Sequence, residues 1–340
     1  QRLRAAALLE QSGFEAVSVG AWAAARRSLE RALALRKSEP ESGQATYRAD
    51  IALGQACMRL GDYAAAEAAL ERGLVEAHDA GDSVAEAEGL AHLAFLLDDR
   101  GQFERARALG EAALRLARES GCPSLPYTLY VAAGTASSAG DLTAGERLAS
   151  EALHQARAAG NQEIETRALN MLGSFAFLRR EQDEARAYFE SALAQARANG
   201  NLSLEATLLL NLGNNAYFRG DYDAAQAYAQ AALARAGDLG ERVVMSFCLL
   251  NLAQANLKLG DIAAAKQGAR EALALAREVG MPPVIVNGIS LSGQILAAEG
   301  RLDRALAYFG LARAHPAADH QLRVEIDEDL AGLGLRGPQV

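Results

Sequence analysis

Apolar residues recur along most of the chain with the spacing of one face of an α-helix, and the stretches that carry them are rich in Ala, Leu, Glu and Arg. These four residues are strong helix formers, so pattern and composition predict the same element. Glycines punctuate the pattern about every twenty residues, as expected where helices end in a left-handed residue. We therefore expect an all-α fold made of short helices joined by tight turns.

The glycines form two interleaved series, each with a period close to 40 residues. The first series precedes the second helix of each predicted pair, with arginine in the fifth copy: Gly20, Gly61, Gly101, Gly140, Arg180, Gly220, Gly260 and Gly300. The second series is Gly81, Gly121, Gly160, Gly200, Gly240 and Gly280. This lattice predicts a right-handed superhelical α-solenoid of eight helix-turn-helix repeats over residues 1–314, followed by a capping helix and tail over residues 315–340.

Small side chains occupy fixed phases within every repeat. The fifth residue after each turn residue is small from Ala25 to Ala305, and the residue seven positions later is small from Ala32 to Ala312. Small residues at constant phase let helix backbones approach closely, so we expect the second helix of each pair to pack tightly against its neighbours.

Charge and composition exclude several classes of function. The chain has 43 acidic and 34 basic residues, a net charge of −9, and no basic stripe, which argues against nucleic acid and anionic membranes as partners. There is no run of eighteen apolar residues, so a cytoplasmic location is the default expectation. Cys57, Cys122 and Cys248 are too scattered for a zinc site or a disulfide framework. Because the chain begins at Gln1 without methionine, we expect it to be part of a longer protein.

The repeat resembles the tetratricopeptide repeat. Leu53-Gly54 and Leu212-Gly213 are each followed seven residues later by Gly-Asp-Tyr, and the likeness covers about residues 2–314. The period exceeds the usual value of about 34 residues, and such long units resemble the sensor arms of bacterial STAND-class signal-transduction ATPases, including maltose-activator-like regulators. The resemblance implies a covalently attached effector domain in the full-length protein. The C-terminal segment is interpreted as a capping helix, with Asp327 and Asp329 on its solvated face.

In a stack of this family the first helix of each unit lines the concave side, and four positions per unit face inward. In the last four units these positions hold amides and apolar side chains and almost no charge, although 23% of the chain is charged. Helix interiors disfavour asparagine, so we interpret the stripe as a binding surface rather than a solvated face. An amide is both donor and acceptor and therefore suits the backbone of an extended peptide. The candidate ligand-binding residues of the stripe are Arg167, Asn170, Ser174, Thr207, Asn211, Asn214, Phe247, Asn251, Gln254, Asn287 and Gln294.

Two further candidates, Tyr127 and Tyr130, lie one helical turn apart in the fourth unit. They can contact a ligand beside Arg167, or they can fill the space left by the small residues 132–134; the sequence favours neither alternative. This unit is the weakest copy of the repeat, because Gly145 replaces the usual alanine, and we expect local flexibility there. The corresponding positions of the first units carry both signs of charge and predict no ligand charge.

Known tetratricopeptide domains that bind chaperone C-termini use a carboxylate clamp of Lys, Asn, Asn, Lys and Arg. Asn214 and Asn251 resemble the two asparagines of that clamp, but Leu210 and Phe247 stand where it has lysine. Binding of chaperone tails is therefore disfavoured.

Catalytic motifs are missing from the sequence. It contains no phosphate-binding loop ending in Lys-Ser or Lys-Thr, no His-Glu-x-x-His, no Gly-x-Ser-x-Gly and no Cys-x-x-Cys. We expect no enzymatic activity, no metal and no cofactor. The leading hypothesis is a sensor or interaction module that binds a peptide or protein segment in its concave groove. The alternatives are a purely structural assembly scaffold and a small-molecule sensor.

Overall fold

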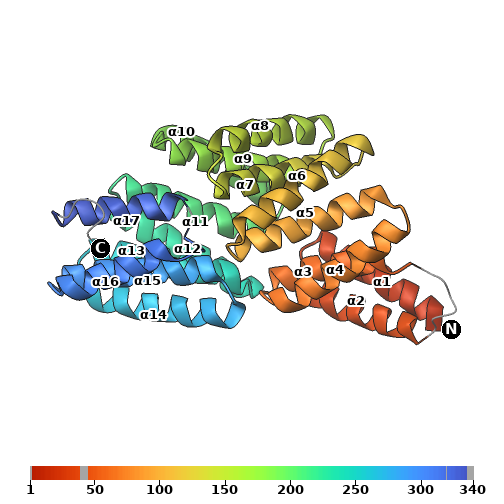
Figure 1. The fold of residues 1–340 in the computed structure, drawn as a ribbon, viewed down its shortest axis with the longest axis horizontal. Coiled ribbons are helices and arrows are strands. Elements are labelled where there is room, and N and C mark those ends of the chain that lie inside the picture. The colour runs from red at the N-terminus through yellow and green to blue at the C-terminus, as the bar shows by residue number, and fades with distance from the viewer. Residues whose placement is uncertain (1, 39–44, 319, 335–340) are drawn as a thin grey trace. The chain divides into compact units, whose positions relative to one another are not determined.

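The structure, a computed structural model, describes residues 2–38, 45–318 and 320–334. In these ranges the chain forms helices and no strand, which confirms the all-α prediction (Figure 1). Residues 335–340 of the expected tail lie outside the described residues. The helices are α1 (Arg2–Ser18), α2 (Trp22–Lys37), α3 (Tyr47–Arg59), α4 (Tyr63–Asp79), α5 (Ser83–Asp99), α6 (Phe103–Glu119), α7 (Leu125–Ser138), α8 (Leu142–Ala158), α9 (Gln162–Leu178), α10 (Gln182–Ala198), α11 (Leu202–Phe218), α12 (Tyr222–Leu239), α13 (Arg242–Lys258), α14 (Ile262–Val279), α15 (Pro282–Ala298), α16 (Leu302–Ala314) and α17 (His320–Gly332).

The turns between these helices follow the two glycine series. Every residue of both series has a positive φ, between 61° and 92°. A left-handed residue ends a helix and satisfies its last carbonyl groups, and glycine adopts this conformation without a steric cost. Arg180, with φ 64°, is the one residue other than glycine with positive φ in the described part of the chain. The backbone at position 180 has the same left-handed conformation as the glycines of the series, although a residue with a Cβ atom disfavours that conformation.

Short polar residues begin most helices. The carboxylate of Asp221 accepts a hydrogen bond from the amide of Ala224 at 3.1 Å, and the equivalent aspartates of α4, α8 and α14 do the same. Asn161 and Asn201 cap α9 and α11 in the same way. Glu241 stands at this position before α13, but it makes no capping bond. It is 3% exposed, and neither carboxylate oxygen has a hydrogen-bond partner among the described residues.

Complementary sizes determine how closely the two helices of a pair approach. A Cβ atom built on Gly173 of α9 would lie 2.6 Å from the ring of Phe189 on α10. In the equivalent pair of another repeat, a Cβ atom built on Gly54 would also lie 2.6 Å from the side chain of Leu70. Where the sequence has Ala253 in place of this glycine, the opposing position is the small Ala269. A large side chain on the second helix thus requires a glycine on the first.

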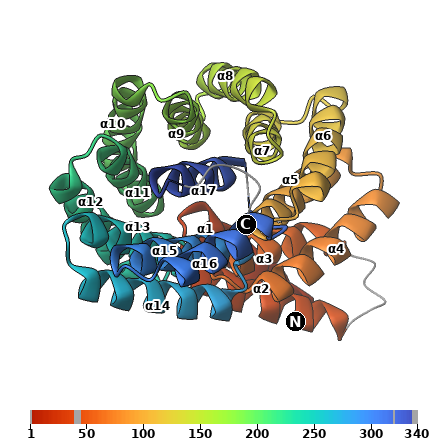
Figure 2. The same ribbon diagram turned by 60° about the vertical axis from the view of Figure 1, so that its left-hand side comes forward.

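The chain divides into two compact units. Unit 1 comprises residues 1–98 and 103–135, and unit 2 comprises residues 99–102 and 136–340. In unit 1, α1 packs against α2 and α3, and α3 packs against α4. In unit 2, each helix from α8 to α16 packs against the next along the chain. In addition α9, α11, α13 and α15 contact one another in that order. We call these four helices the inner row. Figure 2 shows α17 on the side of the stack that they line.

Helix α17 closes the end of unit 2. Leu322, Ile326 and Leu330 form its apolar side, are at most 8% exposed and pack into the same buried cluster as Phe309 of α16. The expected capping helix is therefore present. The interpretation of its acidic side as wholly solvated is wrong for Asp329, which is partly buried and accepts a hydrogen bond from Gln294 of α15 at 2.7 Å. The apolar side of α17 holds the helix against α15 and α16, and this brings one edge of its polar side onto the inner row.

Candidate functional site

The polar stripe predicted from the sequence lies on consecutive helices of the inner row. Because these helices touch one another in order, repeat positions about 40 residues apart come to lie on neighbouring helices. Arg167 is 9% exposed and the other members are partly buried. The residues are Arg167, Asn170 and Ser174 on α9, Thr207, Asn211 and Asn214 on α11, Phe247, Asn251 and Gln254 on α13, and Asn287 and Gln294 on α15.

One pair of these amides bridges two repeats directly. The side-chain amide of Asn211 donates to the side-chain oxygen of Asn170 at 2.7 Å. Each amide retains further donor and acceptor capacity after this bond. Ser174 and Thr207 donate their hydroxyl groups to backbone carbonyls one turn earlier, at 3.2 Å each. The hydroxyl oxygens therefore remain available as acceptors.

Three other amides of the stripe have no hydrogen-bond partner in the part of the chain that the structure describes. The side chains of Asn214, Asn251 and Gln254 form no hydrogen bond with any residue that the structure describes, and all three are partly buried. Asn215, one position further along α11, shows the contrasting arrangement, because it is 1% exposed and donates to Gln182 at 2.7 Å and 3.1 Å. The inner row thus carries two kinds of amide. Some form hydrogen bonds between repeats, and others keep their donors and acceptors available to a ligand.

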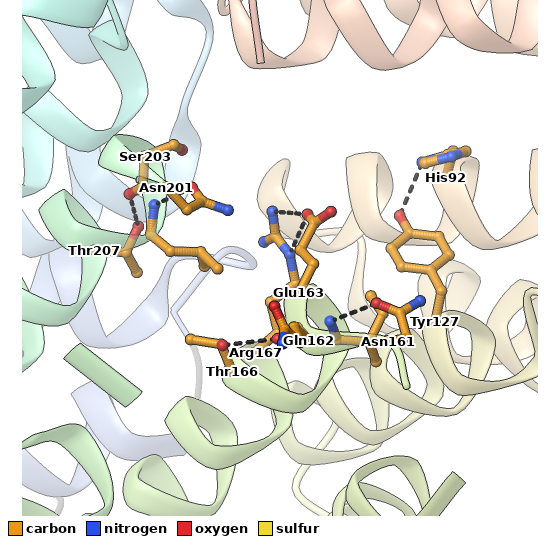
Figure 3. Close-up of polar contacts among 12 residues, drawn as sticks. His92, Tyr127, Asn161, Gln162, Glu163, Thr166, Arg167, Asn201, Ser203 and Thr207 are labelled. Carbon is orange, nitrogen blue, oxygen red and sulfur yellow. Dashed lines mark hydrogen bonds and ion pairs between the residues drawn. The ribbon is translucent and has the colours of Figure 1, made fainter. Parts of the chain in front are cut away.

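A buried cation lies beside the amide pair. Arg167 donates from Nε and Nη2 to one carboxylate oxygen of Glu163, at 3.0 Å and 2.9 Å (Figure 3). The guanidinium side chain is 10% exposed, whereas the Glu163 side chain is 53% exposed. Because the Glu163 carboxylate pairs with this guanidinium group, Arg167 adds an oriented donor but no net charge to the stripe.

The two candidate tyrosines belong to unit 1. The hydroxyl of Tyr127 lies 2.8 Å from Nδ1 of His92, and their ring centroids are 4.9 Å apart (Figure 3). The ring of Tyr130 follows at 6.3 Å from that of Tyr127. Both tyrosines pack on a buried cluster that includes Ala91 and Val131. His92 is 9% exposed, so this contact lies in the interior of unit 1.

Three residues that sequence reasoning did not select lie at the end of the inner row nearest α17. Arg180 forms an ion pair with Glu328 of α17. Lys258 lies with Nζ 5.9 Å from the ring centroid of Tyr217. Burial raises the pKa of Tyr217, and the charges of Asp329 and Glu325 raise it further. One sequence feature distinguishes Arg180 beforehand: it interrupts the glycine series.

Reactive groups are scarce in the described residues. The three cysteines are buried thiols, and burial raises the pKa of Cys57 to about 11 and that of Cys248 to about 12, which leaves them protonated and poorly nucleophilic. No group of three or more His, Cys, Asp or Glu side chains in the described ranges is arranged to hold a metal ion. No helix there has both the length and the hydropathy to cross a bilayer.

A stack of helical hairpins with a row of bridging and unpartnered amides defines an α-helical repeat protein of the interaction type. Family models described as tetratricopeptide repeat match residues 15–84, 87–120 and 204–278, together more than half of the chain. The chain belongs to the tetratricopeptide repeat family. No curated protein matches its sequence.

Solved structures with the same fold span nearly the whole chain. One is a Rap protein complexed with Competence and Sporulation Factor, with TM-score 0.68, 12% identity and coverage of 95% of this chain and 99% of that chain. Another is NprR in complex with its cognate peptide NprX, with TM-score 0.67, 14% identity and coverage of 96% and 92%. A third is the STAND protein PH0952 from Pyrococcus horikoshii, which has a tetratricopeptide repeat sensor (TM-score 0.51, 15% identity, 96% of this chain and 47% of that chain). At these identities the likeness establishes the fold.

Proposed function

We propose that this protein is a non-enzymatic recognition module that binds an extended segment of a partner protein along the inner row of unit 2. The observation that carries the proposal is the set of amides on consecutive helices, of which Asn170 and Asn211 are joined and Asn214, Asn251 and Gln254 have no partner among the described residues.

The chemistry of the row suits a peptide backbone. A backbone presents one donor and one acceptor per residue, and a primary amide can satisfy both at once. The apolar neighbours Leu210 and Phe247 are partly buried and supply contact area between the amides. Affinity from main-chain hydrogen bonds with side chains packed between them is a general mode of peptide recognition.

The comparisons support the same function. Two structures of similar fold are complexes, one of a Rap protein with Competence and Sporulation Factor and one of NprR with its cognate peptide. A third similar structure is a signal-transduction ATPase with a tetratricopeptide repeat sensor, and this chain covers 47% of that chain. We propose that the present chain is likewise the sensing arm of a longer signalling protein whose effector domain responds to the bound segment.

The test replaces two amides of the row together. Each neutral hydrogen bond contributes about 1 kcal/mol net, and an unsatisfied partner in a desolvated complex costs about 1–3 kcal/mol. Asn211→Ala with Asn251→Ala should therefore weaken binding of a peptide selected from a displayed random library at least tenfold, about 1.4 kcal/mol. Asn199→Ala, at the exposed end of α10, is the matched control and should leave affinity unchanged.

Far-ultraviolet circular dichroism of both variants should match the parent, which excludes unfolding as the cause. If the selected peptide binds the double variant as tightly as the parent, the inner row is not the recognition site, and an assembly scaffold that uses another surface becomes the better account.

A further inference from the structure

The acidic edge of α17 contacts α15 and the turn after α9, and its carboxylates interact electrostatically with residues of α11 and α13. Glu328 pairs with Arg180, which lies in the turn after α9. Asp329 accepts from Gln294 of α15 and feels the positive charge of Lys258 at the end of α13. Tyr217 of α11 lies within the field of the same carboxylates. A single helix of this chain thus interacts, by contact or by charge, with residues of four successive repeats.

Charge at this surface is complementary. Arg180 and Lys258 supply two cations, and the carboxylates that face them belong to α17. The candidate stripe beside them is neutral apart from Arg167. Without α17, this end of the row presents positive charge next to an aromatic ring and an amide.

This surface holds three local conflicts, two of which lie in the contact between α17 and α15. Arg180 adopts a left-handed conformation that favours glycine, at the one copy of its series where glycine is absent. The Oε1 atom of Gln294 is buried with no hydrogen-bond partner among the described residues. Burial of Asp329 outweighs its bond from Gln294 and raises the pKa of its carboxyl. Local conflicts that gather at one place are typical of functional surfaces, where another state relieves them.

We propose that Arg180, Tyr217, Lys258 and Gln294 form a binding subsite for an acidic segment of the partner, and that α17 occupies this subsite in the free protein. The proposal rests on the function proposed above and adds the charge of the ligand. An incoming segment places one carboxylate opposite Arg180, a second beside Tyr217 and Lys258, and a neutral donor opposite Oε1 of Gln294. Such a segment satisfies the atom that α17 leaves unpaired, and it displaces α17 by competition.

The experiment uses the full chain with α17 loosened. Ile326 is fully buried between α17 and the end of the stack, so Ile326→Ala weakens docking of α17 without touching the subsite. The probe is a fluorescent peptide with the sequence of residues 320–334 carrying Asp329→Asn, which keeps Glu325 and Glu328 and offers an amide donor to Gln294. The matched probe also carries Glu325→Gln and Glu328→Gln and so lacks those two carboxylates.

The Ile326→Ala chain should bind the acidic probe about tenfold more tightly than the matched probe in low salt, and the parent chain should bind both more weakly. Adding Arg180→Gly should reduce affinity for the acidic probe about threefold to fivefold, the range of one exposed ion pair, and leave the matched probe unaffected. Because glycine also relieves the backbone at position 180, a loss of affinity together with unchanged or higher thermal stability separates recognition from folding.

Equal affinity for the two probes, no binding of either, or indifference to Arg180→Gly would overturn the proposal. A dimer of the Ile326→Ala chain on size-exclusion chromatography, with no binding of the acidic probe, would overturn it in favour of exchange of α17 between copies. If Ile326→Ala lowers helicity, hydrogen exchange of α17 in the parent chain replaces it: excess acidic probe should speed exchange over residues 320–332, and unchanged exchange contradicts the proposal. If these tests fail while the Asn211→Ala, Asn251→Ala double variant still loses affinity for its selected peptide, the proposal for the inner row stands. Only the acidic subsite is then ruled out.

Discussion

Gly173→Ala tests whether complementary side-chain sizes determine the spacing of each helix pair. The added Cβ would lie 2.6 Å and 2.7 Å from two ring carbons of Phe189, which is 2% exposed. Carbon atoms in contact prefer about 3.5–4.0 Å, so the ring must move by about 1 Å. Overpacking of this kind costs about 1–3 kcal/mol, and replacing a helical glycine by alanine gains about 1 kcal/mol. The expected net loss of stability is about 1 kcal/mol.

The same substitution should reverse its sign when the ring is absent. In a Phe189→Ala background, which imitates the pair Ala253 and Ala269, only the helix-propensity gain of about 1 kcal/mol remains. The two backgrounds therefore differ by about 2 kcal/mol, a coupling that a double-mutant cycle measures directly. Gly237→Ala is the control, because no atom lies within 4 Å of its added Cβ, and it should stabilise by about 0.5–1 kcal/mol.

Urea unfolding followed by circular dichroism gives the four free energies, and hydrogen exchange of α9 and α10 localises the change, since repeat proteins depart from two-state unfolding. Phe189→Ala itself should cost about 3–5 kcal/mol, so its helicity is checked first; Phe189→Leu is the milder alternative. Should Gly173→Ala have the same effect in both backgrounds, or stabilise as Gly237→Ala does, the size-complementarity argument is refuted.

Three further predictions concern capping, pH and local opening. Glu241→Asn should raise the free energy of unfolding by about 1 kcal/mol, because asparagine at this position accepts from the amide of Val244 as the asparagines before α9 and α11 do from theirs; no gain in urea unfolding would contradict this. Burial raises the pKa of Asp50 despite its bond from Arg72 at 2.6 Å, so the folded state holds that proton more tightly than the unfolded state and the contribution of Asp50 to stability falls as pH rises from about 4. Asp50→Asn should therefore be most favourable, relative to the parent, at neutral pH, and parallel profiles of urea midpoint against pH would rule this out. Hydrogen exchange should be fastest over residues 123–160, where the boundary between the two units falls within α7, and protection there equal to that of α9–α12 would count against a weak fourth repeat.

The sequence by itself determined the helices and their order. Helix ends depend on φ at single residues, and glycine at a fixed phase specifies a left-handed turn without any distant contact. Arg180 adopts φ 64°, as the glycines of its series do, although arginine disfavours this conformation. The two helices that the turn joins therefore determine the backbone conformation there. The placement of Asn170 and Asn211 on neighbouring helices was equally predictable, since a constant period transfers positions from one repeat to the next, and their 2.7 Å hydrogen bond follows from that.

Only the tertiary structure decided which polar groups find partners. Gln294 and Asp329 are 35 residues apart, and Arg180 and Glu328 are 148 residues apart, so no local pattern links them. Their contacts depend on the direction in which α17 leaves α16 and on the small rotations that add up over the repeats between α9 and α17. The burial of Glu241 is decided in the same way, because it results from packing of neighbouring helices around a turn that the sequence marks as polar. Periodicity specifies where a residue stands in its repeat, whereas partners, burial and charge depend on elements that the period does not describe.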